Sequence, residues 1–303
     1  MTTRLAARLH SGTMEGVTPL EQFEEQRPRL FGIAYRMLGS VAEAEDVVQD
    51  AWLRWNGATG VEDAAAFLTT VVTRLSINVL ESARVTRESY IGPWLPEPVD
   101  TSNDPLLGAE RAEALELAVL LLLERLTPVE RAAFVLHEAF AYPHRRIAEV
   151  LDVSESNARQ LASRARRRID SDRGRIASPA ERDRLLAAFV AALQAGDVAG
   201  LEAVLVEDAV SVSDGGGVVS AARNVVTGRA RVAALLAGLV AKYGADIRVQ
   251  PVLANGEVAT LAIRGDEPLA LWTFDFAPEG VRRFLIVLNP HKLSAYRAYA
   301  TSA

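Results

Sequence analysis

The spacing of apolar residues changes once along this chain of 303 residues, and that change limits the possible folds more than any other feature. From Leu20 to about residue 170, apolar residues recur at intervals of three and four, which predicts helices. From about residue 209 to 289 they alternate with polar residues, which predicts strands. The sequence therefore predicts a multidomain protein. Two all-helical domains would precede an α+β domain with a curved antiparallel sheet.

A proline-rich stretch at residues 88–107 separates the two helical parts. It holds four prolines, which lack the backbone donor that a helix needs. We therefore expect a leader at 1–18, helical domains at 19–87 and 108–172, a linker at 88–107 and an α+β domain at 173–303. Within the linker, the segment WLPEP is stiff and apolar, so we expect it to dock on a surface.

One helical segment is basic although the chain is acidic, with a net charge of -6. Residues 140–169 carry seven basic and three acidic residues, and positive charge gathered in one place is typical of an element that binds nucleic acid. A helix over 155–169, capped by Ser154, would place Ala158, Leu161, Ala162, Ala165 and Ile169 on one apolar face.

The short helix HRRIAEVL and the turn DVS come directly before this segment. Together they predict a helix-turn-helix, whose second helix enters the major groove of DNA. The candidate DNA contacts are Ser156, Asn157, Arg159, Gln160, Ser163, Arg164 and Arg167. The alternative interpretation is an ordinary helix with a solvated basic face.

Composition excludes several kinds of site. The chain has no cysteine, so disulfides and thiolate chemistry are excluded, and its four histidines make no ligand pair at helical spacing. We expect no metal and no cofactor. No apolar run reaches the roughly 18 residues of a membrane span, so we expect a cytoplasmic protein without a membrane partner.

Two long segments resemble a known family. The segment LTPVERAAFVLHEAFAYPHRRIAEVLDVSESNARQLASRARRRI resembles region 4 of bacterial extracytoplasmic-function (ECF) sigma factors, and FGIAYRMLGSVAEAEDVVQDAWLRW resembles their region 2. The resemblance implies an alternative sigma factor that directs RNA polymerase to specific promoters, and not an enzyme. The helix over 154–168 would then read the -35 promoter element.

The resemblance also assigns roles to residues of region 2. The face that would bind core RNA polymerase carries Glu45, Asp46, Gln49, Asp50 and Arg54. The candidates for contact with the melted -10 element are Arg74, Asn78, Arg84 and Arg87. The family usually has an Arg-Asn pair and then an Asp in this helix, whereas Leu75 and Asn78 stand at those places here.

The last 130 or so residues are an addition to the ordinary family plan. Their layout resembles the subgroup with a fused SnoaL-like domain, through YIGPWLPEP in the linker, SDGGG after the first strand and NPHKL after the last. Val218 and His291 depart from the motifs of that subgroup. We expect these motifs to dock the C-terminal domain on region 2 and the linker, and to tune activity in cis. The expected interdomain residues are Trp94, Leu95, Pro96, Glu97, Pro98, Asp214, Gly215, Gly216, Gly217, Asn289, Pro290, His291, Lys292 and Leu293.

Other readings of the C-terminal domain stay open. A pocket in it could bind a small-molecule ligand, and the chain would then be a ligand-sensing DNA-binding regulator that acts without core polymerase. Catalysis would need a carboxylate or histidine with a polar partner, and Asp214, Asp246, Asp275 and His291 are the available candidates. The alternation of Trp272, Phe274 and Phe276 with polar residues predicts one face of a sheet in the core.

Overall fold

The computed structural model describes residues 18–88, 90–102 and 115–301. The predicted leader, apart from Thr18, and the predicted boundary between residues 107 and 108 lie outside the described residues. Side chains are described up to Ser82 in the third helix, so Arg84 and Arg87 are placed only by their backbone.

Three helices form the first bundle, α1 (Pro19–Leu38), α2 (Val41–Asn56) and α3 (Ala64–Glu88). Thr18 caps α1 in a reciprocal capping box with Glu21, and Gly39 ends that helix in the left-handed conformation. Ser40 then starts α2, as its type and place predict, because its side chain accepts a hydrogen bond from the backbone of Glu43.

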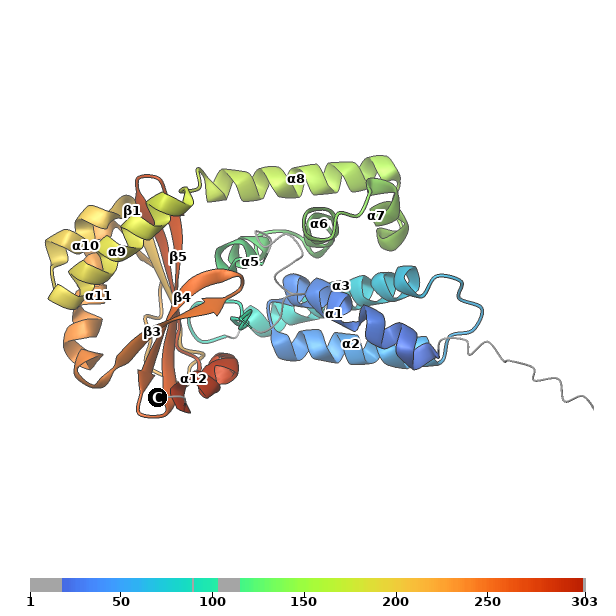
Figure 1. Cartoon of the computed structure of the whole chain (residues 1–303). Coiled ribbons are helices and arrows are strands. Elements are labelled where there is room, and N and C mark those ends of the chain that lie inside the picture. Colours follow the sequence, from blue (N-terminus) through green and yellow to red (C-terminus); the bar gives the residue numbers. More distant parts are fainter. Residues whose placement is uncertain (1–17, 89, 103–114, 302–303) are drawn as a thin grey trace, which may run out of the picture.

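The second helical part consists of α5 (Leu117–Leu123), α6 (Pro128–Phe134), the π-helix η2 (Val135–Ala139), α7 (His144–Leu151) and α8 (Glu155–Arg173). Thr127 caps α6 and Pro128 is its first residue, as these residue types favour. Buried residues of both helical parts form one hydrophobic cluster, and α3 lies against α6 and α7. The two helical parts therefore pack together side by side (Figure 1).

The C-terminal part begins with α9 (Pro179–Ala195) and α10 (Val198–Val204) and contains one sheet of six strands. The strands are β1 (Leu205–Asp214), β2 (Val226–Thr227), β3 (Arg248–Ala254), β4 (Glu257–Arg264), β5 (Glu267–Ala277) and β6 (Gly280–Val287). Helix α11 (Arg229–Tyr243) and the short 3-10 helix η3 (Gly244–Asp246) lie between β2 and β3. The chain closes with the 3-10 helix η4 (Pro290–Tyr296) and with α12 (Arg297–Thr301).

The predicted purely antiparallel sheet is wrong in one respect. The strand order is β2-β1-β6-β5-β4-β3, and β1 runs parallel to its neighbour β6. The other neighbours are antiparallel. Alternation shows which face a residue takes and not which way a strand runs, so the mixed sheet could not be read from it.

Both faces of the sheet are covered. Helices α9, α10 and α11 pack on one face, where Trp272, Phe274 and Phe276 contribute to the core as predicted (Figure 1). The other face packs against Leu95 of the linker, Leu117 of α5 and Leu293 of η4. The sheet therefore lies between its own helices and parts of the helical region. The interdomain residues lie at the contact with the helical region.

One helix in the described part of the chain, Ala64–Ser82 of α3, is long and apolar enough by length and composition to cross a membrane. Its residues Leu68, Val72 and Leu75 are buried in the bundle. A helix in the core of a bundle is long and apolar as well, because its buried face packs against the other helices.

Candidate nucleic-acid interface and interdomain contacts

Helix α8 has the predicted arrangement of a recognition helix. Ser154 caps it, and the predicted apolar residues Ala158, Leu161, Ala162, Ala165 and Ile169 are all buried. Its 19 residues give a rod of about 28 Å, which is a suitable length for the major groove. Asp152, in the left-handed conformation with φ of 56°, ends α7 and forms the tight turn before α8.

The predicted DNA contacts lie along the outside of α8. Ser156, Asn157, Arg159, Gln160, Ser163, Arg164 and Arg167 are all exposed. All three arginines have a partner within the protein. Arg164 lies 3.6 Å from the buried Glu130 of α6, and Arg167 donates to the Ser163 carbonyl at 3.4 Å. Arg159 lies 3.3 Å from Glu155, and because both side chains of this pair are exposed it contributes little to stability and leaves Arg159 available to phosphates.

The predicted polymerase-binding residues lie together on α2. Asp46, Gln49, Asp50 and Arg54 are exposed, while Glu45 forms an ion pair of 2.6 Å with Arg27 of α1. The same helix exposes Leu53, with 62% of its surface accessible, which sequence reasoning did not single out. An exposed leucine on an acidic helix face is the type of side chain that a protein partner covers.

Two of the predicted -10 contacts, Arg74 and Asn78, lie one turn apart on α3 and are both exposed. Arg74 also donates a hydrogen bond of 3.0 Å to the backbone carbonyl of Val150 in α7. The side chains of Arg84 and Arg87 lie outside the described residues. In this arrangement, helix α3 therefore directs one of its arginines towards the helix-turn-helix.

Further contacts join the two helical parts. Arg131 of α6 is buried and donates 2.7 Å hydrogen bonds to the carbonyl of Met37 and to Glu124. The guanidinium of Arg29 lies over the ring of Tyr142 at 4.9 Å, a cation–π geometry. These contacts hold the helix-turn-helix part against the first bundle in one closed arrangement.

Asp214, at the end of β1, is the centre of the contacts between linker and sheet. It is completely buried and accepts hydrogen bonds from Tyr90 Oη at 2.6 Å, from the Leu95 backbone at 2.9 Å and from Lys292 Nζ at 2.8 Å. Burial and the Asp214 carboxylate raise the pKa of Tyr90. We call Asp214, Tyr90, Leu95 and Lys292 the linker seam. It brings together all three motifs of the predicted interdomain set.

The glycines of the SDGGG motif allow the linker and the NPHKL segment to approach the backbone closely. Gly216 and Gly217 have positive φ angles of 60° and 73°. A Cβ atom on Gly216 would collide with the side-chain amide of Asn289, and one on Gly217 would lie 2.9 Å from Ile91 Cδ1. Gly215 has no room for a side chain either, because a Cβ there would lie 2.6 Å from the Val219 carbonyl.

The two departures from the subgroup motifs lie on the surface. Val218 is 56% exposed, and His291 is exposed and donates its backbone N–H to Asn289 Oδ1 at 3.1 Å. Neither side chain belongs to the linker seam. Pro290 is half-buried and Leu293 is fully buried in the core beneath the sheet.

The rest of WLPEP faces the first helical bundle. Glu97 accepts the backbone N–H of Val41 at 2.9 Å, and its own N–H donates to the Gly39 carbonyl at 2.8 Å. Burial raises the pKa of Glu97. The carboxylate lies at the start of α2, where the helix dipole favours negative charge. Trp94 and Pro96 pack on Gly39, and Pro98 is buried. The WLPEP segment therefore contacts the first helical bundle as well as the C-terminal sheet.

Asn255 is an interdomain residue that sequence reasoning missed. The Asn-Gly pair at 255–256 is the dipeptide that favours a tight hairpin turn, and it forms one here with φ of 56° at Asn255. The Asn255 side chain is nevertheless buried, with only 1% of its surface exposed. Its amide donates to Tyr35 Oη at 2.7 Å and to the Leu115 carbonyl at 3.0 Å, and it accepts from the Val99 backbone at 3.0 Å. One turn residue thus joins region 2, the linker and the segment before α5.

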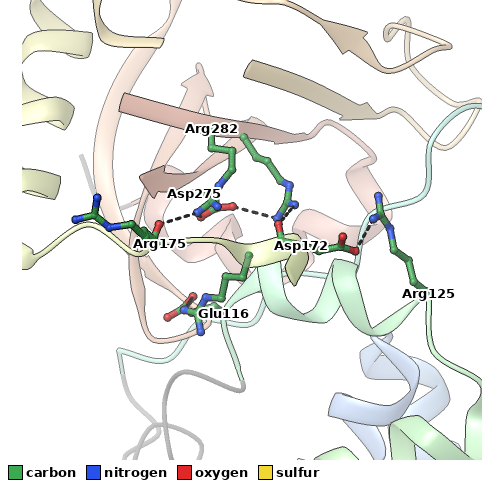
Figure 2. A network of polar contacts seen from close by, with 8 residues as sticks. Glu116, Arg125, Asp172, Arg175, Asp275 and Arg282 are labelled. Atoms are coloured by element: carbon green, nitrogen blue, oxygen red, sulfur yellow. Dashed lines mark hydrogen bonds and ion pairs between the residues drawn. The ribbon is translucent and has the colours of Figure 1, made fainter. Parts of the chain in front are cut away.

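A second group of contacts, also unexpected, joins the end of α8 to the sheet. Asp275 of β5 pairs with Arg282 and Arg283 of β6, each at 3.1 Å (Figure 2). Arg283 donates to the Asp172 carbonyl at 2.7 Å, and Arg282 donates to the Arg175 carbonyl at 3.3 Å. We call these five residues the helix joint. The sequence suggests Asp275 only as a candidate acid or base.

The four candidate acid and base residues are not brought together. Asp214 is opposite Val287 of β6 and Asp275 is opposite Arg283, four positions away, or about 13 Å along the strand. Asp246 and His291 are exposed. Within the described ranges, no group of three or more histidine, aspartate or glutamate residues could hold a metal ion.

A helix-turn-helix with a polar outer face, packed beside a bundle with an acidic helix, defines a DNA-binding transcription protein. The Sigma-70 region 2 family matches residues 22–86 and the Sigma-70 region 4 family matches residues 116–169. The chain is 42% identical over 248 residues to the ECF RNA polymerase sigma factor SigJ of Mycobacterium tuberculosis, covering 79% of each chain. It is 37% identical over 185 residues to a probable ECF RNA polymerase sigma factor, SigI, of the same species, covering 59% of this chain and 64% of that protein.

The crystal structure of the M. tuberculosis sigma factor SigJ superimposes with a TM-score of 0.74 at 36% identity, and covers 91% of this chain and 98% of that one. The chain belongs to the ECF sigma factors of the sigma-70 family, which confirms the family expected from regions 2 and 4. Because the superposition covers 91% of the chain, the likeness extends into the C-terminal sheet.

Proposed function

We propose that this ECF sigma factor directs core RNA polymerase to specific promoters under the control of its own C-terminal domain. Residues 19–87 form the region 2 domain, 108–172 the region 4 domain, and 173–303 a SnoaL-like domain joined to both through the linker at 88–107. Region 4 reads the -35 element with the exposed residues of α8. The acidic face of α2, with Leu53 beside it, binds the polymerase.

The observation that carries the control in cis is the burial of Asp214. A completely buried carboxylate that accepts from Tyr90, Leu95 and Lys292 holds the linker on the sheet, and the same linker contacts Gly39 and Val41 of region 2. Removing one partner of a buried ion pair costs about 3–5 kcal/mol, which is enough to change a docking equilibrium more than a hundredfold. The linker seam therefore sets how readily the closed arrangement opens.

The test is run-off transcription with core polymerase and the full chain, either unsubstituted or with Asp214→Asn. Asp266→Asn, an exposed aspartate in the turn between β4 and β5, is the matched control. We expect initiation only with core polymerase, a change of at least tenfold with D214N, and none with D266N. The direction of the change gives the sign of the control.

Two results would overturn parts of the proposal. If D214N initiates like the unsubstituted chain, control through the linker seam is wrong while the sigma function stands. If no chain initiates but the unsubstituted protein binds duplex DNA alone, the protein is a one-component regulator instead, and a small-molecule ligand of the C-terminal domain becomes the next question.

A further inference from the structure

The C-terminal end of α8 is attached to the sheet by more than the covalent chain. Arg283 binds the carbonyl of Asp172 in the last turn of the helix, and Arg282 binds the carbonyl of Arg175 just beyond it. Asp275 holds both guanidinium groups from the neighbouring strand (Figure 2). The last carbonyls of a helix have no partners within the helix and form the negative end of its dipole, so Arg283 completes this end while Arg282 holds the chain just beyond it.

The helix joint is well shielded from water. The side chains of Asp275, Arg282 and Arg283 are 9%, 16% and 13% exposed. Gly174 ends α8 with φ of 61°, and a Cβ atom there would lie 2.5 Å from Arg282 Nη1, so the chain passes directly beneath the guanidinium. Beyond it, the backbone N–H of Ala177 donates to the Phe276 carbonyl at 3.1 Å. The connection between recognition helix and sheet therefore leaves little freedom for a hinge.

A second set of contacts fixes region 4 from its other side. Arg173, the last residue of α8, pairs with Glu116 at 2.5 Å, and Arg125 pairs with Asp172 at 2.5 Å. Leu117, the first residue of α5, is buried in the cluster beneath the sheet. The two ion pairs fix the end of α8 to the segment around α5, and region 4 shares a backbone contact and a hydrophobic core with the C-terminal domain.

Region 2 is attached differently. Tyr35 reaches the sheet through Asn255, and the other contacts described above run through the linker or through region 4, such as Arg74 with Val150. The two promoter elements lie about 25 base pairs apart, on the order of 85 Å, whereas α3 of region 2 is in direct contact with α7 of region 4 in this structure. A factor that reads both elements has to separate region 2 from region 4.

We propose that Asp275, Arg282 and Arg283 are positioning residues for promoter recognition: they fix α8 to the sheet, so that region 4 and the C-terminal domain move as one body while region 2 separates. This proposal rests on the proposed sigma function. It gives the C-terminal domain a direct role in aiming the recognition helix, in addition to its hold on the linker.

The absence of cysteine allows a direct test with pairs of spin labels. Labels at Ala42 of region 2, Glu149 of region 4 and Ala241 of α11 occupy exposed positions, and pulsed electron resonance measures their separations two at a time. From the free protein to the complex with core polymerase and promoter, we expect the Glu149–Ala241 distance to stay constant and the Ala42–Glu149 distance to lengthen by about 20 Å or more.

A constant Ala42–Ala241 distance with a longer Glu149–Ala241 distance would overturn the proposal, because the C-terminal domain would then travel with region 2. Distances that are all unchanged in an initiating complex, or all changed, would overturn it as well. If the unsubstituted chain does not initiate, the sigma function fails separately. The free protein still tests the joint, since Asp275→Asn should broaden the Glu149–Ala241 distances, and an unchanged width would refute it.

A substitution tests the positioning role itself. Arg283→Lys keeps the charge opposite Asp275 but lacks the fork that also reaches the Asp172 carbonyl. We expect initiation from a promoter with its -35 element to fall about tenfold, and initiation from the same promoter with that element scrambled to stay unchanged. Glu279→Gln, which removes an exposed ion pair to Arg175, is the control and should change neither. An equal loss at both promoters would mean a merely structural role.

Discussion

The linker seam and the helix joint both centre on an aspartate in a strand beside β6, yet they are built differently. Asp214 accepts directly from segments far away in the sequence, including Tyr90 and Leu95. Asp275 contacts two arginines of the adjacent strand, and these arginines reach the end of α8. The difference shows which contacts can be recognised in a sequence. Asp214, which accepts hydrogen bonds directly, stands in an unusual glycine-rich motif, whereas Asp275, which acts through arginines, stands in an ordinary strand sequence.

The largest expected effect is at the linker seam. Asp214→Ala should lower the free energy of unfolding by about 3–5 kcal/mol, because it removes the buried carboxylate that pairs with Lys292 and accepts from two further donors. Urea denaturation of the full chain measures the change. The same experiment on Asp266→Ala is the control, and a loss below about 1 kcal/mol for D214A would contradict the comparison.

The second-largest effect on stability is expected at Glu116, which lies beside the helix joint. Burial, only partly offset by Arg173, raises the pKa of Glu116 to about 7. Its folded pKa lies above its unfolded value, so the group contributes stability below about pH 4.5 that is lost as the pH rises to 7. The loss amounts to at most about 3 kcal/mol.

Glu116→Gln should therefore flatten the dependence of stability on pH between 4.5 and 7. Thermal unfolding of both proteins across that range measures it. Glu257 also faces Glu116, with Arg182 as its ion-pair partner, so Glu257→Gln is the comparison variant. Parallel pH profiles for E116Q and the unsubstituted chain would rule out this assignment.

A smaller effect is expected from the glycines of the linker seam. Gly216→Ala should cost about 2 kcal/mol, since the new methyl meets the Asn289 amide and the φ of 60° disfavours alanine. Gly265→Ala is a matched control, with φ of 56° and nothing within 4 Å, and should cost only about 1 kcal/mol. Equal losses would show that the close approach to Asn289 contributes nothing.

The smallest effect is expected at the rim of the helix joint. The pair Arg175–Glu279 is 3.6 Å apart with side chains 81% and 63% exposed. Glu279→Gln should change the free energy of unfolding by less than about 0.5 kcal/mol. Denaturation at low and at physiological salt checks this, and a salt-dependent loss above about 1 kcal/mol would show that the Arg175–Glu279 ion pair also stabilises the joint.

Much of this organisation could be predicted from the sequence. The caps Ser154 and Thr127 and the apolar face of α8 follow from local rules that tertiary contacts did not override. Asp214 is among the interdomain residues expected from the sequence, because its motif is glycine-rich and unusual. Asn255 was predicted only as a turn residue, since its backbone explained the Asn-Gly pair and nothing local indicated three long-range hydrogen bonds.

The helix joint was not predicted, for a related reason. Asp275 alternates with Phe274 and Phe276 as a polar strand residue ordinarily does. Arg282 and Arg283 are adjacent polar residues of the next strand, and beyond the sheet they bind backbone carbonyls, which every residue has. The parallel direction of β1 relative to β6 is likewise a property of the chain path and not of either segment. Local patterns identified the elements, while the contacts between elements depended on their arrangement in space.

That parallel pair has a practical consequence for protein engineering. Since β1 and β6 run in the same direction, the loops that follow them, SDGGG and NPHKL, leave the sheet at the same end although they are separated by more than seventy residues. Together with the linker they form one contact surface made of three separate segments. A chimera that takes one piece from a relative has to take the other two as well, and a library that shuffles them independently should yield mostly mismatched proteins.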